Sequence, residues 1–238
     1  MDIGNIARNV SIYAVPVLMA IILHEVAHGW VAEKFGDSTA RKMGRITLNP
    51  LKHIDPIGTV VLPIFLLVVK SPFLFGWAKP VPVNFAALRN PKRDMIWVGL
   101  AGPATNFLLA MFSAILLRVF LMTEPGLLSA IQMSPEELHQ TGIGVSVLAP
   151  VALMLTKSIE INSVLMVLNM VPVPPLDGGR VAVGLLPREL AYSYSKLERF
   201  GMLIVIMLIF VIPQTQGMFY AVIKAFALMF YGVALAGI

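Results

Sequence analysis

A series of long apolar runs, separated by short polar segments, constrains the fold of this chain more than any other feature. A helix needs about 20 predominantly apolar residues to cross the hydrocarbon core of a bilayer. Of the 238 residues, 58% are hydrophobic and 13% are charged, which is far from the balance of a soluble globular domain. The sequence therefore predicts an all-α polytopic membrane protein with about five to six transmembrane helices. The runs lie near residues 10–32, 56–70, 95–121, 144–171, 200–213 and 217–236.

The run near residues 56–70 differs from the others. It has Pro63 near its centre and is marginal in length, so we expect a short re-entrant or interfacial segment there. The polar stretches between the runs are too short to bury a core of their own. We therefore expect residues 1–238 to form a single membrane-embedded domain, with a core over about 10–186 and accessory C-terminal helices over about 200–236. The first run follows no small-residue cleavage pattern, so we expect a retained helix and not a signal peptide.

The positions of lysine and arginine predict the orientation in the membrane. Basic residues concentrate in cytoplasmic loops, and both loops beside residues 56–70 are rich in them. Residues 122–143 carry glutamates but no lysine or arginine, whereas residues 174–199 are basic. We therefore expect a multi-pass protein of the cell (plasma or inner) membrane with an extracytoplasmic N-terminus. Helices 10–32 and 144–171 then run inward, and helix 95–121 runs outward.

The chain contains no cysteine, which excludes disulfides and thiolate metal ligands. Any metal ion must therefore be held by nitrogen and oxygen donors. The formal net charge is +5, and the basic residues are spread through the loops of an apolar chain. This distribution suits contact with the anionic headgroups of the lipid bilayer, and we expect no nucleic acid partner.

The stretch ILHEVAHGW, residues 22–30, places three ionisable side chains near the end of the first apolar run. On a helix, His28 lies about 40° from His24, and Glu25 lies on the same side. Two histidines four residues apart can ligate one zinc ion, and the adjacent glutamate can accept a proton from the attacking water, as in HExxH metalloproteases. The alternative is a chance group of polar side chains that neighbouring helices satisfy. The cost of charge within an apolar run favours the metal site.

Zinc in hydrolytic sites usually has three protein ligands, so a third donor is required. The segment LNMVPVPPLDGGR, residues 168–180, follows the helix near residues 144–171. Its prolines break helical geometry, and its glycines loosen the backbone around Asp177. An ordinary loop at a helix end is the simpler interpretation of this composition. With two histidines expected at the same membrane face, Asp177 becomes the candidate third ligand.

HEVAHG and NMVPVPPLDGG together resemble the paired signature of the site-2 protease family of intramembrane zinc metalloproteases. AGPATN, residues 101–106, resembles a further block of that family, and the resemblance extends from the first helix to about residue 186. It implies a three-helix catalytic core (about 10–32, 95–121 and 144–171). It also implies that His24, His28 and Asp177 bind one Zn²⁺ per chain and that Glu25 is the general base or acid.

The same resemblance implies that Asn169 holds the substrate or the developing oxyanion. The alternative role is a helix-terminal amide that satisfies the backbone freed by Pro172. Many members of the family carry a PDZ or CBS domain, and neither fits in the loops of this sequence. The sequence therefore resembles the compact branch of the family.

Two segments between the first helix and residue 95 are candidates for contact with a substrate. A substrate helix must unwind before hydrolysis, and pairing with an edge strand would hold it extended. Residues 44–50, GRITLNP, alternate apolar and polar positions, and residues 76–85, GWAKPVPVNF, contain prolines that prevent a helix. The resemblance implies a small membrane-associated β segment and an active-site loop here, and plain connecting loops are the alternative. The candidate substrate-binding residues are Arg45, Ile46, Thr47, Leu48, Lys79, Pro80, Val81 and Pro82.

Other polar or small residues within the apolar runs receive structural roles. Gly102 permits close helix approach, and Asn106 can hydrogen-bond across that approach. Lys157 and Glu160, at positions i and i+3, are expected to form an internal ion pair.

Together these features predict an intramembrane zinc endopeptidase that hydrolyses peptide bonds in transmembrane protein substrates near the cytoplasmic face. The alternative is a metal transporter or a non-catalytic zinc-binding membrane protein. A transporter needs polar groups along a path through the bilayer, whereas the candidate ligands gather at one face.

Overall fold

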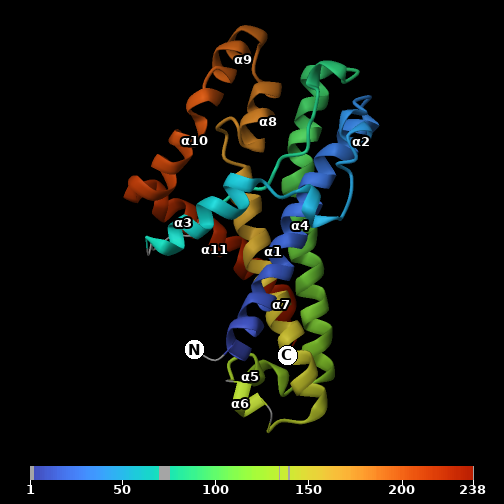
Figure 1. The fold of residues 1–238 in the computed structure, drawn as a ribbon, viewed down its shortest axis with the longest axis vertical. Coiled ribbons are helices and arrows are strands. Elements are labelled where there is room, and N and C mark those ends of the chain that lie inside the picture. The colour runs from blue at the N-terminus through green and yellow to red at the C-terminus, as the bar shows by residue number, and fades with distance from the viewer. Residues whose placement is uncertain (1–2, 70–75, 134, 139, 238) are drawn as a thin grey trace.

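The computed structural model describes residues 3–69, 76–133, 135–138 and 140–237, and within these ranges the chain forms helices and no strand. Figure 1 shows an elongated bundle whose longest helices run side by side along the vertical axis. The elements are α1 (Ile3–Lys34), α2 (Thr39–Lys42), η1 (Pro50–Lys52), η2 (Pro56–Val61), α3 (Leu62–Val68), η3 (Phe85–Ala87), α4 (Pro91–Thr123), α5 (Leu127–Ala130), α6 (Pro135–Leu138), α7 (Ile143–Asn169), α8 (Asp177–Leu185), α9 (Arg188–Ser195), α10 (Glu198–Ile206), η4 (Met207–Val211) and α11 (Pro213–Leu235).

Four of the described helices are long and apolar enough to cross a membrane: most of α1, and α4, α7 and α11. They coincide with the predicted runs near residues 10–32, 95–121, 144–171 and 217–236. The run near residues 200–213 corresponds to α10 and η4, which follow each other directly and together cover residues 198–211, fewer than the about 20 residues needed to span. The predicted count of five to six transmembrane helices is therefore not confirmed, and the described residues contain four candidate spans.

The short elements η2 and α3 account for the described part of the run near residues 56–70. Asp55 caps this stretch, since its Oδ1 accepts hydrogen bonds from the backbone N–H groups of Ile57 and Gly58 at 3.0 and 2.7 Å. The stretch is much shorter than the four long helices. This length agrees with a segment that does not cross the bilayer, and residue 70 lies outside the described residues.

The predicted β segment is not confirmed. Residues 44–50 and 76–85 contain no strand, although residues 76–84 are free of helix. Pro80 and Pro82 leave one edge of this segment without N–H donors. On the other edge, the N–H groups of Lys79 and Val81 donate to the His53 carbonyl and to Glu25, and not to residues 44–50. Side-chain contacts hold the two segments together instead.

α4 lies at the centre of the bundle and packs against α1, α7, α8 and α11. Buried alanines, among them Ala110 and Ala114 of α4 and Ala149 and Ala152 of α7, belong to one hydrophobic cluster that also includes residues of α5 and α11. Small side chains allow the two backbones to approach closely, which is how helices associate in membranes. α2, α8 and α9 gather at one end of the bundle, and α5 and α6 lie at the other (Figure 1).

Candidate metal centre

Three buried side chains from distant parts of the chain converge beside α4. His24 and His28 lie on successive turns of α1, and Asp177 is the first residue of α8. The Nε2 atoms of His24 and His28 lie 3.1 and 3.2 Å from Oδ2 of Asp177, and 3.1 Å from each other. The structure thus brings together the three residues that the sequence predicts as ligands.

The hydrogen bonds of the two imidazoles determine which nitrogen faces the carboxylate. His28 Nδ1 lies 2.7 Å from the Val98 carbonyl, which can only accept, so this nitrogen carries a proton. His24 Nδ1 lies 2.6 Å from Oδ1 of Asn106. The amide nitrogen of Asn106 donates to Asn162, so the oxygen of Asn106 is the acceptor for His24. In each neutral ring, Nε2 therefore directs a lone pair toward Asp177.

This donor set fits a zinc ion. Three acceptor atoms face one another, and Oδ2 of Asp177 is buried without a hydrogen-bond partner. Zinc bonds of about 2.0–2.2 Å in tetrahedral geometry place neighbouring ligand atoms roughly 3.3 Å apart, close to the distances seen here.

The proline-rich turn after α7 places Asp177 opposite the histidines. Three prolines within residues 172–175 prevent α7 from continuing beyond Asn169. A Cβ on Gly178 would collide with the Met170 carbonyl, and one on Gly179 would collide with the backbone of Pro174. These glycines therefore let the turn fold back on the end of α7, so that α8 begins at the metal centre.

Gly102 sets the approach of α4 to the histidines. A Cβ at this position would overlap the imidazole rings of both His24 and His28. The expected packing role of Gly102 is thus confirmed, and its neighbours in space are the candidate ligands themselves.

Gly102→Ala is expected to displace the imidazoles, since overpacking of this kind costs about 1–3 kcal/mol. We expect a lower zinc content and a lower midpoint of thermal unfolding in detergent. Gly232→Ala in α11 is the matched control, because a Cβ there meets no atom within 4 Å. Full zinc content in Gly102→Ala would contradict the packing described here.

Glu25 lies at the wall of a cavity of about 320 Å³, which we call the Glu25 cavity. Its Oε2 accepts a hydrogen bond of 2.6 Å from the backbone N–H of Val81. His24 and Asn169 line the same cavity, together with side chains of α10 and η4. Asn169 also donates from Nδ2 to the Leu165 carbonyl at 3.0 Å, the local contact expected of a helix-terminal amide.

The two predicted substrate segments lie beside α1. Arg45 is buried, and its Nη2 donates to the carbonyls of Lys79 and Pro80 at 2.8 and 3.2 Å. The backbone N–H of Lys79 donates to the His53 carbonyl at 2.9 Å. Since Val81 donates to Glu25 and prolines have no N–H, the N–H donors of residues 79–82 are engaged or absent. Ile46, Thr47, Leu48 and Pro82 are at least partly accessible.

Asp37 anchors the far end of the second segment. Its Oδ2 accepts from the backbone N–H of Asn84 at 2.6 Å, and its Oδ1 accepts from the backbone N–H of Thr39 at 2.9 Å. Burial raises the pKa of the Asp37 carboxyl, and these hydrogen bonds lower it by more, so the net shift is downward. The segment that reaches Glu25 is therefore fixed at both ends.

A buried chain of hydrogen bonds behind His24 was not predicted as part of the site. Asn106 Nδ2 donates to Oδ1 of Asn162 at 2.7 Å, and Asn162 donates to the Ser158 carbonyl at 2.8 Å. Ser113 donates to the Ser158 hydroxyl at 2.8 Å. The sequence indicates a cross-helix hydrogen bond for Asn106, but not its partner. The sequence feature that points to Asn106 is an amide side chain in the middle of an apolar run, where polar groups are rare.

Asn106→Ala is expected to weaken zinc binding about 10- to 100-fold, as loss of a hydrogen-bonded partner of a histidine ligand typically does. Chelator competition measures the affinity, and the absorption of the cobalt-substituted protein reports the ligand geometry. Asn106→Asp keeps an oxygen acceptor and is expected to retain more metal. Thr105→Ala is the control, because the Thr105 hydroxyl donates to the carbonyl of Ala101 within its own helix. Equal affinity in Asn106→Ala and Thr105→Ala would exclude this role.

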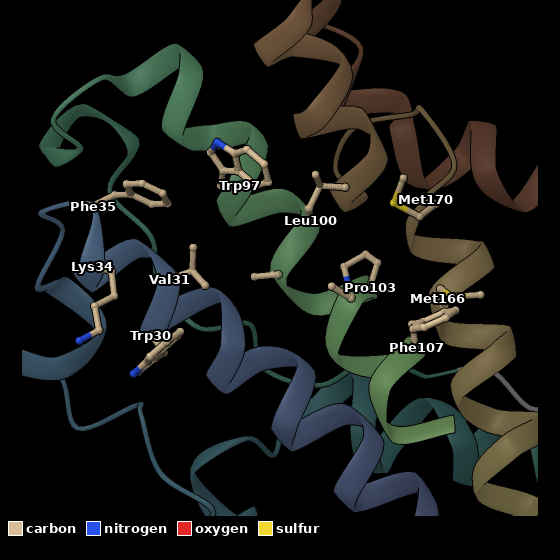
Figure 2. A pocket seen from close by; sticks show the side chains of 12 residues that line it. Trp30, Val31, Lys34, Phe35, Trp97, Leu100, Pro103, Phe107, Met166 and Met170 are labelled. Atoms are coloured by element: carbon tan, nitrogen blue, oxygen red, sulfur yellow. The ribbon is translucent and has the colours of Figure 1, made fainter. Parts of the chain in front are cut away.

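A second cavity, of about 610 Å³, opens between α1, α4 and α7. Figure 2 shows Trp30 and Lys34 on α1, Trp97 on α4 and Met166 on α7 around it. On α1, Lys34 lies about 180° from Glu25, so this groove faces away from the Glu25 cavity. Its wall is mainly apolar and includes none of the candidate ligands, so we do not assign chemistry to it.

Comparison with known proteins agrees with this geometry. The model of peptidase family M50 matches residues 12–212, a range that includes all three candidate ligands. "Putative zinc metalloprotease YwhC" of Bacillus subtilis is 34% identical over 211 residues, which cover 89% of this chain and 85% of that protein. "Putative zinc metalloprotease Rip2" of Mycolicibacterium smegmatis is 28% identical over 209 residues, 88% of this chain and 70% of that protein. Rip2 of Mycobacterium tuberculosis is 28% identical over 207 residues, 87% of this chain and 69% of that protein. No solved structure matches.

Proposed function

The chain belongs to peptidase family M50, the site-2 protease family, and we propose that it hydrolyses peptide bonds inside the transmembrane segments of other membrane proteins. The family and the named relatives identify a zinc metalloprotease with several apolar helices in a bilayer. The depth of the metal centre is the observation that supports cleavage within the membrane.

This depth follows from the position of His24 on α1. Trp30 and Trp97 are each about half exposed at the rim of the second cavity (Figure 2). Tryptophan side chains gather at the level of the lipid headgroups, so they mark that level at this end of the bundle. His24 precedes Trp30 by six residues, which is about 9 Å along the helix. A peptide bond that reaches His24 therefore lies below the headgroups.

We assign His24, His28 and Asp177 as the ligands of one zinc ion. When bound, zinc supplies a Lewis acid that polarises the scissile carbonyl and lowers the pKa of the attacking water. Glu25, beside His24 in the Glu25 cavity, accepts a proton from the water and delivers it to the leaving amine. The hydrogen bond from Val81 orients the Glu25 carboxylate for this transfer.

Asn169 is assigned to the substrate carbonyl or the developing oxyanion. It lines the Glu25 cavity, and a side-chain amide can donate to negative charge that develops there. Because Nδ2 donates to the Leu165 carbonyl, a second amide hydrogen or a rotation of the side chain must serve the substrate.

We propose that residues 45–48 and 79–82 contact the substrate mainly through their side chains. The N–H donors of residues 79–82 are used or missing, so extended pairing with a substrate must use neighbouring backbone groups or follow a shift of this segment. The accessible side chains of these segments remain available for contact with a substrate: Ile46, Thr47, Leu48, Lys79, Pro80 and Pro82.

We propose a cytoplasmic location for the metal-centre end of the bundle and an extracytoplasmic N-terminus. The backbone N–H of Arg89 donates to the Phe35 carbonyl at 2.9 Å. The two basic loops on either side of residues 56–70 therefore meet at the end of the bundle that holds the metal centre. The segment with α5 and α6, which carries no lysine or arginine, lies at the other end (Figure 1). This asymmetry follows the excess of basic residues in cytoplasmic loops.

Single cysteines at positions 41 and 89 are expected to react with an impermeant maleimide only after the cells are permeabilised. A cysteine at position 124 should react in intact cells. The chain has no native cysteine, so each label reports one position. Reaction of positions 41 and 89 from opposite sides would show that residues 56–70 cross the membrane.

The function is tested with purified protein in liposomes and a panel of single-span substrates, with cleavage sites determined by mass spectrometry. Cleavage inside the span that stops on chelation and returns with zinc is the expected result. Zinc binding without cleavage of any substrate, or zinc flux into the vesicles, would favour the binding or transport alternative.

A further inference from the structure

An ion pair lies within the apolar part of α7, away from the metal centre. Lys157 Nζ lies 2.7 Å from Oε2 of Glu160. Tyr231 of α11 donates to Oε1 of Glu160 at 3.1 Å, and the Lys157 ammonium lies 5.4 Å from the ring centroid of Tyr13 on α1. The expected ion pair is therefore present, and its neighbours connect α1, α7 and α11.

This cluster is not sealed inside the bundle. The side chains of Lys157 and Glu160 are 24% and 42% exposed, and Tyr13 is half exposed. Charged groups in spanning segments almost always face a bundle interior or a water-filled cavity, because contact with lipid tails is costly. The partly exposed ion pair of Lys157 and Glu160 therefore indicates that another polar group contacts this face of α7 within the membrane.

The exposed face of α7 leads from the ion pair to the Glu25 cavity. Leu165 and Leu168 line that cavity. Lys157 and Leu168 lie only about 20° apart around the helix, because eleven residues make close to three turns. Ile161 and Val164 lie between them and are partly exposed. An apolar stripe therefore joins the ion pair to the cavity, and a segment that enters along this stripe passes over Lys157.

We propose that Lys157 and Glu160 recognise a hydrogen-bonding side chain within the transmembrane segment of the substrate. This inference rests on the proposed function and adds a determinant of selectivity at a distance from the metal centre. Lys157 can donate, and the Glu160 carboxylate can accept. A side-chain amide, as in glutamine or asparagine, does both at once and carries no charge into the bilayer.

The position of the recognised residue follows from the helix geometry. Glu160 and Lys157 precede Asn169 by nine and twelve residues, which is about 14 and 18 Å at 1.5 Å per residue. A substrate that is extended for about three residues at the metal centre and helical beyond it covers this distance in roughly seven residues. A fully helical one needs about eleven. The residue therefore lies about seven to eleven positions from the scissile bond, on the side that is deeper in the membrane.

The wild-type protein alone provides the first test. In a single-span substrate, one glutamine replaces methionine, which has a similar shape, at each position from five to thirteen residues beyond the cleavage site. We expect cleavage to rise about three- to twentyfold at one or two adjacent positions, the range that interhelical hydrogen bonds in membranes provide. An equal rate at every position would overturn the inference while leaving the proposed function intact.

The second test removes the ion pair. In Lys157→Met with Glu160→Met, the ratio of cleavage between the preferred glutamine substrate and its methionine counterpart is expected to fall to about one. Using the ratio makes the result independent of the amount of folded enzyme. Lys224→Met, which removes an exposed lysine from α11, is the matched control and should keep the preference. A preference that survives in the double variant would overturn the inference.

A photo-crosslinker at Tyr13 identifies what covers this face. Crosslinks to the substrate segment at the preferred position are expected. Crosslinks to a second copy of the chain or to lipid alone would overturn the inference. Failure of the wild-type protein to cleave any substrate would count against the proposed function and is distinguishable from all of these results.

Discussion

Glu25→Gln is expected to retain zinc and to lower the cleavage rate by roughly 10²- to 10⁴-fold, the usual contribution of a general acid–base group. Glutamine keeps the shape of the side chain and a carbonyl oxygen that can accept from Val81, so the fold and the ligands should be undisturbed. It cannot accept the proton from water. The measurements are zinc content per chain and the rate of appearance of cleaved substrate in liposomes.

Glu33→Gln is the matched control for this variant. Glu33 lies on the same helix, and its carboxylate pairs with Arg41 at 2.7 Å on the surface, away from the metal centre. The exposed ion pair contributes little to stability, so Glu33→Gln should cleave at close to the wild-type rate. If Glu25→Gln holds zinc and cleaves as fast as Glu33→Gln, Glu25 is not the proton carrier.

Asp177→Ala is expected to leave the purified protein with little zinc and no cleavage. Zinc binding to four-ligand structural sites has an apparent free energy of about 10–16 kcal/mol, or roughly 3–4 kcal/mol per ligand. Loss of one ligand should therefore weaken zinc binding on the order of 10²- to 10³-fold. His24→Ala should have the same result, because it removes another candidate ligand, whose Nε2 lies beside Oδ2 of Asp177. Zinc content and chelator competition measure the effect.

Glu189→Ala provides the control for Asp177→Ala. It removes one exposed carboxylate from α9, next to α8, without touching the three ligands. Its zinc content should equal that of the wild type. Stoichiometric, tightly held zinc in Asp177→Ala would remove Asp177 from the ligand set and would require another third donor.

The sequence predicts that the three candidate ligands lie together, because the features that place them are local. The i, i+4 spacing of His24 and His28 has a fixed meaning on any helix, and the prolines before Asp177 end α7 wherever they occur. The loop charges place both elements at one end without reference to tertiary structure. The convergence at 3.1–3.2 Å agrees with this reasoning.

The number of membrane spans and the absence of a strand from the described residues could not be predicted from local chemistry. Hydropathy counts the apolar residues near 200–213 but not the interruption at Ile212, which divides them from α11. Alternation in residues 44–50 suggests a strand, but a strand also needs a partner with free N–H groups. Pro80 and Pro82 remove the donors of one edge, and the N–H groups of Lys79 and Val81 at the other edge bond to His53 and Glu25. The long-range contacts of Arg45 are found in place of a ladder.

The sequence also did not predict which side chains hydrogen-bond to the histidines. Asn106 lies 82 residues after His24 in the chain, and its contact depends on how closely α4 approaches α1. Gly102 permits that approach, but the motif shows only a small residue in an apolar run. Which side chains meet across two helices is decided by their rotation and crossing, and a single sequence does not specify either.

The separation of the ligands along the chain has a consequence for biosynthesis. His24 and His28 are made early, but Asp177 follows only after more than half of the chain, including α4 and α7, has been synthesised. A nascent protein that has inserted only its first helix therefore carries two of the three candidate ligands and lacks the carboxylate of Asp177. Under the proposed function, a chain that stops before α8 can pack against α4 lacks one of the three candidate ligands and is therefore expected to be inactive.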